Sequence, residues 1–184
     1  MRRLILVTTT IVFTNCFCLL NLSLAQIWDK NLPSDSRFKI LSEFADSAVR
    51  DNNTGLVWDR EPSPEKVTWK EAKTNCLNMA AGGVWGWRLP SINEIMTLVD
   101  RRGKPGRPVM LPEGHPFNLP TNGDNYTYWS ATADYNPASK SVFWLVHLSI
   151  GKAILATAAQ EDAPPPHVKY FYWCVRGPMQ EGRY

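Results

Sequence analysis

Residues 101–125 form a segment that neither an α-helix nor a long β-strand can cross. Nine of its positions are glycine or proline: Gly103, Pro105, Gly106, Pro108, Pro112, Gly114, Pro116, Pro120 and Gly123. Proline lacks a backbone N–H and fixes φ, and glycine inside a regular element costs conformational entropy. The chain is therefore divided into two parts joined by a long loop, and long loops in compact domains are often functional.

Two segments before this loop predict helices. Each opens with a capping box, in which a Ser or Thr and a Glu three residues later bond to each other's free backbone N–H groups. The boxes are Thr68 with Glu71, and Ser91 with Glu94. Apolar residues follow at helical spacing: Trp69, Ala72, Cys76 and Met79, then Ile92, Ile95, Met96 and Val99. We expect the first helix to end at Gly82–Gly83 and the second near Asp100.

Short apolar runs predict strands on both sides of the loop. They cover residues 38–41, 48–50 and 56–58, with a turn at 51–55, and later 127–132, 142–148, 152–156 and 168–176. The run 142–146 is apolar throughout, as in a central strand that is covered on both faces. With 184 residues, 44% of them hydrophobic, one domain is expected. The fold class is α+β, with two helices flanking a mainly antiparallel sheet.

The N-terminus has the pattern of an export signal. Arg2 and Arg3 precede a mostly apolar stretch over 4–22, and Ser23-Leu24-Ala25 fits the small-x-small cleavage rule. We expect cleavage after Ala25, an irregular lead-in over 26–37 and a periplasmic or extracellular location. An uncleaved anchor is the alternative, although polar residues interrupt the stretch. No other part of the sequence is long and apolar enough to span a membrane.

Removal of residues 1–25 leaves only Cys76 and Cys174 of the four cysteines. Disulfides persist in exported proteins, so pairing of these two is favoured. A closed loop of nearly 100 residues would stabilise the fold by about 4–5 kcal/mol in the chain-entropy description. The alternative is a catalytic thiol, yet neither cysteine lies in a C-x-x-C motif or beside a histidine or cationic cluster.

The charge of the exported chain is concentrated in one place. Eighteen basic and 17 acidic residues remain, a net charge of +1, which does not indicate a nucleic-acid partner. Four cations lie in the loop without an acid among them: Arg101, Arg102, Lys104 and Arg107. They are candidates for binding an anionic ligand such as a sulfated or uronic-acid polysaccharide. Alternatively, the first two complement the dipole of the preceding helix and the others only keep the loop solvated.

Aromatic residues next to loops are further candidates for ligand binding. Trp85, Tyr126, Tyr128 and Trp129 are positioned either to stack on sugar rings or to seal a small core. Trp58, Trp69, Trp144 and Trp173 lie in periodic segments and are expected in the core.

No catalytic or metal-binding constellation is recognisable, and we expect no cofactor. His115, His147 and His167 lack zinc-site spacing, and Ser130 lacks a Gly-x-Ser-x-Gly elbow. Arg88, just before a helix N-terminus, is poorly placed for the helix dipole, so we expect an ion pair with Glu94 or Asp100.

Five motifs in order carry a resemblance to a known family. They are 51–58 (DNNTGLVW), 68–72 (TWKEA) with Cys76, 87–91 (WRLPS) with Glu94 and 98–100 (LVD), 128–132 (YWSAT), and 174–177 (CVRG). This series resembles the Lcl C-terminal domain family, a bacterial domain of unknown function found in secreted and surface proteins. The likeness covers residues 38–177 and leaves 178–184 as a tail.

Two looser resemblances bear on the cysteines. The order of helix, cysteine, glycines and Leu-Pro is similar to C-type-lectin-like folds, which implies a Cys76–Cys174 bond and ligand binding at the long loop. The Glu-Pro-Asn and Trp-Asn-Asp motifs of calcium-dependent sugar binders are missing, so calcium-mediated binding is not expected. Residues 88–91 with Glu94 also resemble formylglycine-generating enzymes, which implies a reactive cysteine pair, although the Trp-Glu of those enzymes is replaced here.

These observations together predict a secreted or cell-envelope module for ligand binding or adhesion that is not an enzyme. The resemblance implies recognition of anionic glycans. An enzyme related to the formylglycine generators, or a purely structural envelope domain, are the alternatives.

Overall fold

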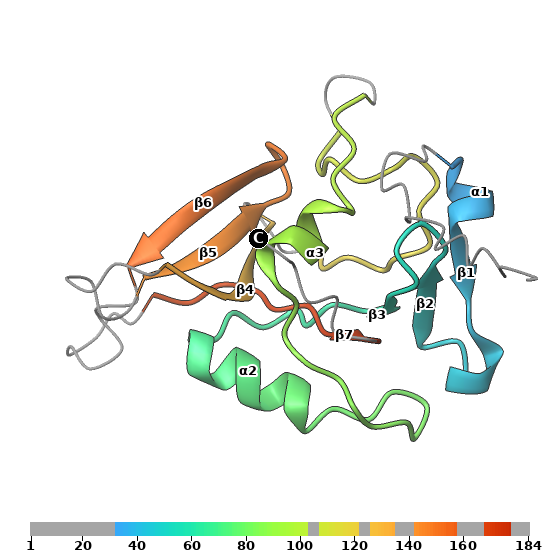
Figure 1. The fold of residues 1–184 in the computed structure, drawn as a ribbon, viewed down its shortest axis with the longest axis horizontal. Helices are drawn as coiled ribbons and strands as arrows, with labels where there is room; N and C mark the ends of the chain where they lie inside the picture. The colour runs from blue at the N-terminus through green and yellow to red at the C-terminus, as the bar shows by residue number, and fades with distance from the viewer. Residues whose placement is uncertain (1–31, 103–106, 122–125, 135–141, 158–167, 178–184) are drawn as a thin grey trace, which may run out of the picture.

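The protein is described by a computed structural model over residues 32–102, 107–121, 126–134, 142–157 and 168–177 (Figure 1). The expected signal segment and tail, Lys104 and His167 lie outside these residues. The fold is α+β, as expected, and no helix in the described ranges is long and apolar enough to cross a membrane. The elements are α1 (Ser34–Arg37), β1 (Phe38–Ile40), the 3-10 helix η1 (Ser42–Phe44), β2 (Ala48–Asp51), β3 (Val57–Asp59), α2 (Trp69–Leu77), α3 (Ile92–Met96), β4 (Thr127–Ala133), β5 (Val142–His147), β6 (Lys152–Thr157) and β7 (Val175–Arg176).

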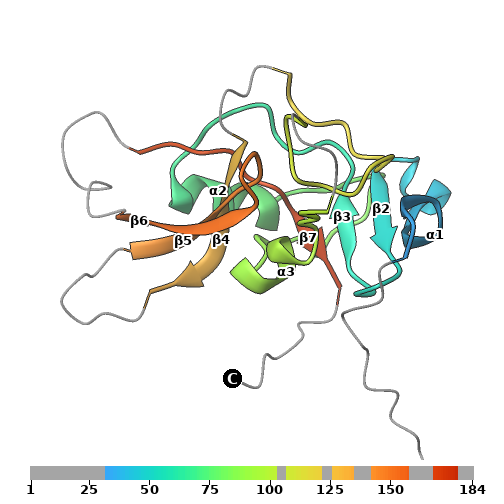
Figure 2. The ribbon, with the colours of Figure 1, turned by 90° about the horizontal axis from the view of Figure 1, so that it is seen from above.

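The strands form two antiparallel sheets rather than the single sheet that the sequence predicted. One has the order β1-β2-β3-β7 and the other β4-β5-β6 (Figure 1). The sheet is divided because residues 168–176 do not form the single long strand that was expected. The first part of this segment makes only isolated bridges, Val67 with Tyr170 and Tyr128 with Phe171, and only its end pairs with β3 as β7. The segment therefore passes from one sheet to the other, as Figure 2 shows from above.

Successive residues of the strands pack alternately into two separate hydrophobic clusters. Val49, Trp58 and Val146 belong to the first cluster, which also contains Ile95 of α3, whereas their neighbours Ala48, Val57 and Leu145 belong to the second, with Ala72 and Cys76 of α2. Successive side chains of a strand point to opposite faces, so both faces are covered. This arrangement explains why β5, the central strand of its sheet, reads as a continuous apolar run.

Helix α2 starts as predicted and ends earlier. The side chain of Thr68 accepts from the Glu71 N–H and Glu71 bonds back, which completes the capping box. The helix ends at Leu77 and not at the two glycines, which have φ values of 55° and 77° and form a separate turn. A Cβ on Gly82 would lie 2.3 Å from the backbone carbon of Phe44, so this turn is pinned against η1.

The second predicted helix, α3, has its capping box at Ser91 and Glu94. Arg88 makes the expected ion pair with Glu94, at 2.8 and 2.6 Å between guanidinium nitrogens and carboxylate oxygens. Although burial raises the pKa of Glu94, the bonds and charge of Arg88 lower it overall. After the regular helix the chain continues in turns. The N–H groups of Leu98 and Val99 donate to the carbonyls of Ile95 and Met96, three residues earlier.

The expected irregular lead-in contains the one-turn helix α1. Its last residue, Arg37, is buried and donates to both carboxylate oxygens of Asp51 in β2, at 3.0 and 2.8 Å. The same guanidinium donates to the Thr97 carbonyl at 2.7 Å. Arg37 therefore ties the start of the domain to the end of α3.

Candidate functional site

The candidate site is a surface hollow of about 370 Å³ at the end of α3, which we call the α3 hollow. It is lined by Met96, Val99, Asp100, Arg101 and Arg102. Two of the expected ligand-binding cations are therefore in its wall. Apolar side chains supply one part of the lining and charged groups the other.

Neighbouring segments hold the wall of the α3 hollow in place. The Asp100 N–H donates to the Met110 carbonyl at 2.7 Å, and the Met110 N–H donates to the Leu148 carbonyl at 2.8 Å. Gly151, in the turn between β5 and β6, has φ 60°, and a Cβ added to it would lie only 2.9 Å from Val99 Cγ1. A side chain at Gly151 would therefore push this wall outward.

Arg101 and Arg107 are structural anchors of the loop. The Arg101 guanidinium donates twice to the Gly151 carbonyl, at 3.0 and 2.6 Å. Arg107 donates to the carbonyls of Leu111 and Asp100, at 2.5 and 3.0 Å. Arg101 therefore bonds across to the β5–β6 turn, a contact that the sequence did not predict. Both side chains donate to carbonyl oxygens of the main chain.

Arg101 and Arg102 are both exposed, and Arg102 differs because its guanidinium pairs with a carboxylate and not with a main-chain carbonyl. The Arg102 side chain is 62% exposed, and it forms an ion pair with Asp100 at 3.0 Å. The hydrogen bond from Arg102 is the main reason why the pKa of Asp100 is lowered. The Arg102 N–H also donates to Asp100 Oδ1, at 2.9 Å. Asp100 therefore orients Arg102 and partly cancels its charge.

The expected sugar-stacking aromatics lie in different environments. Tyr128 and Trp129 are fully buried, one in each cluster, because β4 is covered on both faces. Burial raises the pKa of the Tyr128 hydroxyl. Tyr126 is half-buried against the first cluster, so only Trp85 is strongly exposed among these four. Trp58 and Trp173 are core residues as predicted, and Trp69 and Trp144 are half-buried.

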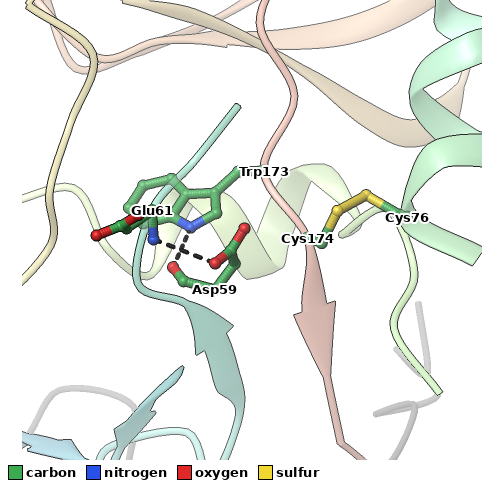
Figure 3. The surroundings of a disulfide bond; sticks show 5 residues. All are labelled: Asp59, Glu61, Cys76, Trp173 and Cys174. Carbon is green, nitrogen blue, oxygen red and sulfur yellow. Dashed lines mark hydrogen bonds between the residues drawn. A yellow bond between two sulfur atoms is a disulfide. The ribbon is translucent and has the colours of Figure 1, made fainter. Parts of the chain in front are cut away.

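Cys76 and Cys174 form the predicted disulfide, with the two Cα atoms 5.4 Å apart (Figure 3). Both residues are buried in the second cluster. The Ser130 hydroxyl donates to the Trp144 carbonyl at 2.7 Å, a bond between neighbouring strands. Within the described ranges, no group of three or more His, Cys, Asp or Glu is placed to hold a metal ion.

Asp59, at the end of β3, is a perturbed carboxyl that the sequence did not indicate. Its N–H donates to the Cys174 carbonyl. Its carbonyl accepts from Trp173 Nε1, and its Oδ1 accepts from the Glu61 N–H at 3.1 Å (Figure 3). Burial raises the pKa of Asp59 to about 7, and the charge of Glu61 adds to this. No cation of the described residues forms an ion pair with it.

Replacing Asp59 by Asn should make stability less dependent on pH. Between the ordinary pKa of 3.8 and about 7, the folded state holds a proton that the unfolded state releases, so stability falls as pH rises through this window. Asn keeps the acceptor for the Glu61 N–H and carries no charge. Urea unfolding at about pH 5 and about pH 8 should show a smaller loss for Asp59→Asn than for the native chain. Equal losses of stability in the two proteins would contradict a raised pKa of the buried Asp59 carboxyl.

The α3 hollow was only half predictable. The cations were evident from the sequence, whereas Met96 and Val99 were assigned to the buried helix face and Asp100 was considered only as a partner for Arg88. The acid two residues before Arg102 is the signal that would have indicated their pairing.

A comparison with protein families matches residues 47–176 to the Lcl C-terminal domain. The chain belongs to this family, because the match covers most of its length and includes both cysteines, α2 and α3. The resemblance found in the sequence is thereby confirmed. A search of curated proteins finds no match.

Proposed function

We propose that this chain is an exported, non-enzymatic binding module that recognises an anionic polysaccharide at the α3 hollow. The observation that carries the proposal is that the α3 hollow combines apolar side chains, Met96 and Val99, with the exposed cation Arg102, which Asp100 orients. We also propose that the architecture is C-type-lectin-like. In support, the disulfide joins the longest helix of the described residues to the residue just before β7, and the long Gly/Pro loop borders the α3 hollow.

The lining suits a sugar ring that carries an acidic group. Met96 and Val99 offer partly buried apolar side chains for the C–H face of a ring. Arg102 offers a planar guanidinium that matches the geometry of a carboxylate or sulfate. Lys104 lies two residues further along the same loop and would add a second cation. A ligand anion would compete with Asp100 for Arg102.

The state of the cysteines supports a binding module over the alternative enzyme. A formylglycine-type reaction needs thiols that reach a substrate, whereas Cys76 and Cys174 are bonded to each other and are 0% and 1% exposed. The Asp59 carboxyl beside the disulfide is bonded to a backbone N–H. The cysteines are thus part of the second hydrophobic cluster.

Neutralising two of the loop cations should weaken binding of an acidic polysaccharide. An exposed ion pair contributes up to about 1 kcal/mol, so Arg102→Gln/Lys104→Gln should raise the Kd for heparin or polygalacturonate by about five- to thirtyfold. The salt dependence of binding should also fall, because exposed charges are screened over about 10 Å at 0.1 M salt. Arg101 and Arg107 are left intact because they anchor the loop.

Two further variants make this test specific. Lys39→Gln/Arg50→Gln removes the same charge from paired, exposed positions of β1 and β2 and should leave binding nearly unchanged. Asp100→Asn keeps Oδ1 as an acceptor but removes the competing negative charge, so it should tighten binding. If both double variants weakened binding equally, recognition would depend on net charge alone and the α3 hollow would not be the site.

A further inference from the structure

Trp85 is displayed on the surface by a turn that the fold holds rigidly. Its side chain is 63% exposed, whereas Trp87, two residues later, is 1% exposed and packs inward. Gly82 is pressed against the Phe44 backbone, and Ala81 and Val84 form a bridge across the turn. An exposed indole on a fixed backbone loses little conformational entropy when it binds a ligand.

Arg176, at the end of β7, lies beside this turn. Its Nε donates to the Trp85 carbonyl at 2.9 Å, and its Cζ is 5.8 Å from the centre of the Phe44 ring. A Cβ on Gly86 would lie 3.4 Å from Arg176 Nε, so the small residue at 86 leaves room for the guanidinium. The backbone of Arg88 exchanges two hydrogen bonds with Val175, which fixes the turn to β7.

Among the residues that the structure describes, the terminal nitrogens of Arg176 have no hydrogen-bond partner and are therefore open to a ligand. Within the described residues, the guanidinium has no carboxylate partner, and Nε is the atom that donates to Trp85. Such a fork binds a carboxylate or sulfate through two parallel hydrogen bonds. The neighbouring indole offers an apolar face on which the C–H side of a sugar ring can pack.

We infer that Trp85 and Arg176 form a second binding site for an acidic sugar, which we call the Trp85 site. The inference rests on the proposed function for the class of its ligand but not for its place. In Figure 1, the chain between α2 and α3 turns back at the lower right, whereas the chain after α3 rises at the top. The two sites therefore contact different parts of a polysaccharide, and a chain that reaches both binds more tightly than either site alone.

The Trp85 site is tested with short acidic oligosaccharides and NMR. The indole N–H signal of Trp85 is identified by its loss in Trp85→Phe, which separates it from the other seven tryptophans. Addition of an oligogalacturonate should shift this signal, and its neutral methyl ester should shift it much less. A sulfated carrageenan oligosaccharide in place of the uronate shows which acidic group is preferred.

Variants assign the interaction to the two residues. Trp85→Ala and Arg176→Gln should each raise the Kd by about tenfold or more, as expected for loss of an aromatic or arginine anchor. Arg50→Gln is the matched charge control and should have no such effect. Because Trp85 is exposed, its replacement should leave the melting temperature nearly unchanged.

The outcomes separate the two proposals. If Arg102→Gln/Lys104→Gln weakens binding and the Trp85 and Arg176 variants do not, the Trp85 site is wrong and the α3 hollow stands. If only the Trp85 and Arg176 variants weaken binding, the Trp85 site stands and the α3 hollow is wrong. An absence of any shift of the Trp85 signal with both acidic oligosaccharides would also overturn the inference.

Discussion

Opening the Cys76–Cys174 disulfide should lower the free energy of unfolding by about 4–5 kcal/mol, among the largest effects expected for this chain. The bond closes a loop with a sequence separation of 98 residues, so its loss gives the unfolded chain much more freedom. It also connects α2 to the segment that passes between the two sheets. A domain whose total stability is about 5–15 kcal/mol would become marginal.

The measurement is urea unfolding of Cys76→Ala/Cys174→Ala beside the native protein. Alanine is chosen because both sulfurs are buried, and a serine would bury an unsatisfied hydroxyl. Reductant should destabilise the native protein and have no effect on the double variant. Equal unfolding midpoints of native protein and double variant would show that the sheets hold together without the bond.

The parts of the fold that were predictable are those that neighbouring residues determine. Both capping boxes are local patterns, and both are formed at the predicted residues. The ion pair of Arg88 with Glu94 joins residues six positions apart. The disulfide was predictable by a different route, because removal of the expected signal segment would leave only two cysteines to pair.

The parts that were not predictable depend on contacts between distant segments. Whether 168–176 is one strand depends on which sheet each of its residues meets, and no local pattern contains that information. Tyr128 and Trp129 adjoin a loop in sequence, yet β4 lies between two clusters and both side chains are buried. A continuous apolar stretch in β5, the strand beside β4, was the available sign that both faces are covered.

The same distinction applies to the candidate sites. The sequence showed that charge is concentrated over 101–107, but not that Arg101 would bond across to Gly151 or that Arg107 would bond to Leu111. It included Trp85 among several aromatics, and only the structure separates it from the buried ones. The partnership of Trp85 with Arg176 spans 91 residues and has no local signal.

The buried ion pair between Arg37 and Asp51 should be essential for stability, in contrast to the exposed pair between Arg102 and Asp100. The side chains of the first pair are 8% and 0% exposed, and those of the second are 62% and 17% exposed. Removing one partner of a buried pair leaves an uncompensated charge and costs about 3–5 kcal/mol. An exposed pair contributes at most about 1 kcal/mol.

Arg37→Met fills a similar volume but removes the cation that pairs with the Asp51 carboxylate. Asp51 keeps the hydrogen bond from the Asn53 N–H. The substitution also removes the hydrogen bond to the Thr97 carbonyl. We expect it to lower the free energy of unfolding by about 3–5 kcal/mol, while Arg102→Gln lowers it by less than about 1 kcal/mol. Arg37→Met/Asp51→Asn should be more stable than the sum of the two single changes predicts, because neither charge is then buried alone. Urea unfolding of the native protein, the two single variants and the double variant measures this coupling. If Arg37→Met cost no more than Arg102→Gln, solvent would have to reach Asp51, and α1 would not be fixed to the end of α3 as the structure has it.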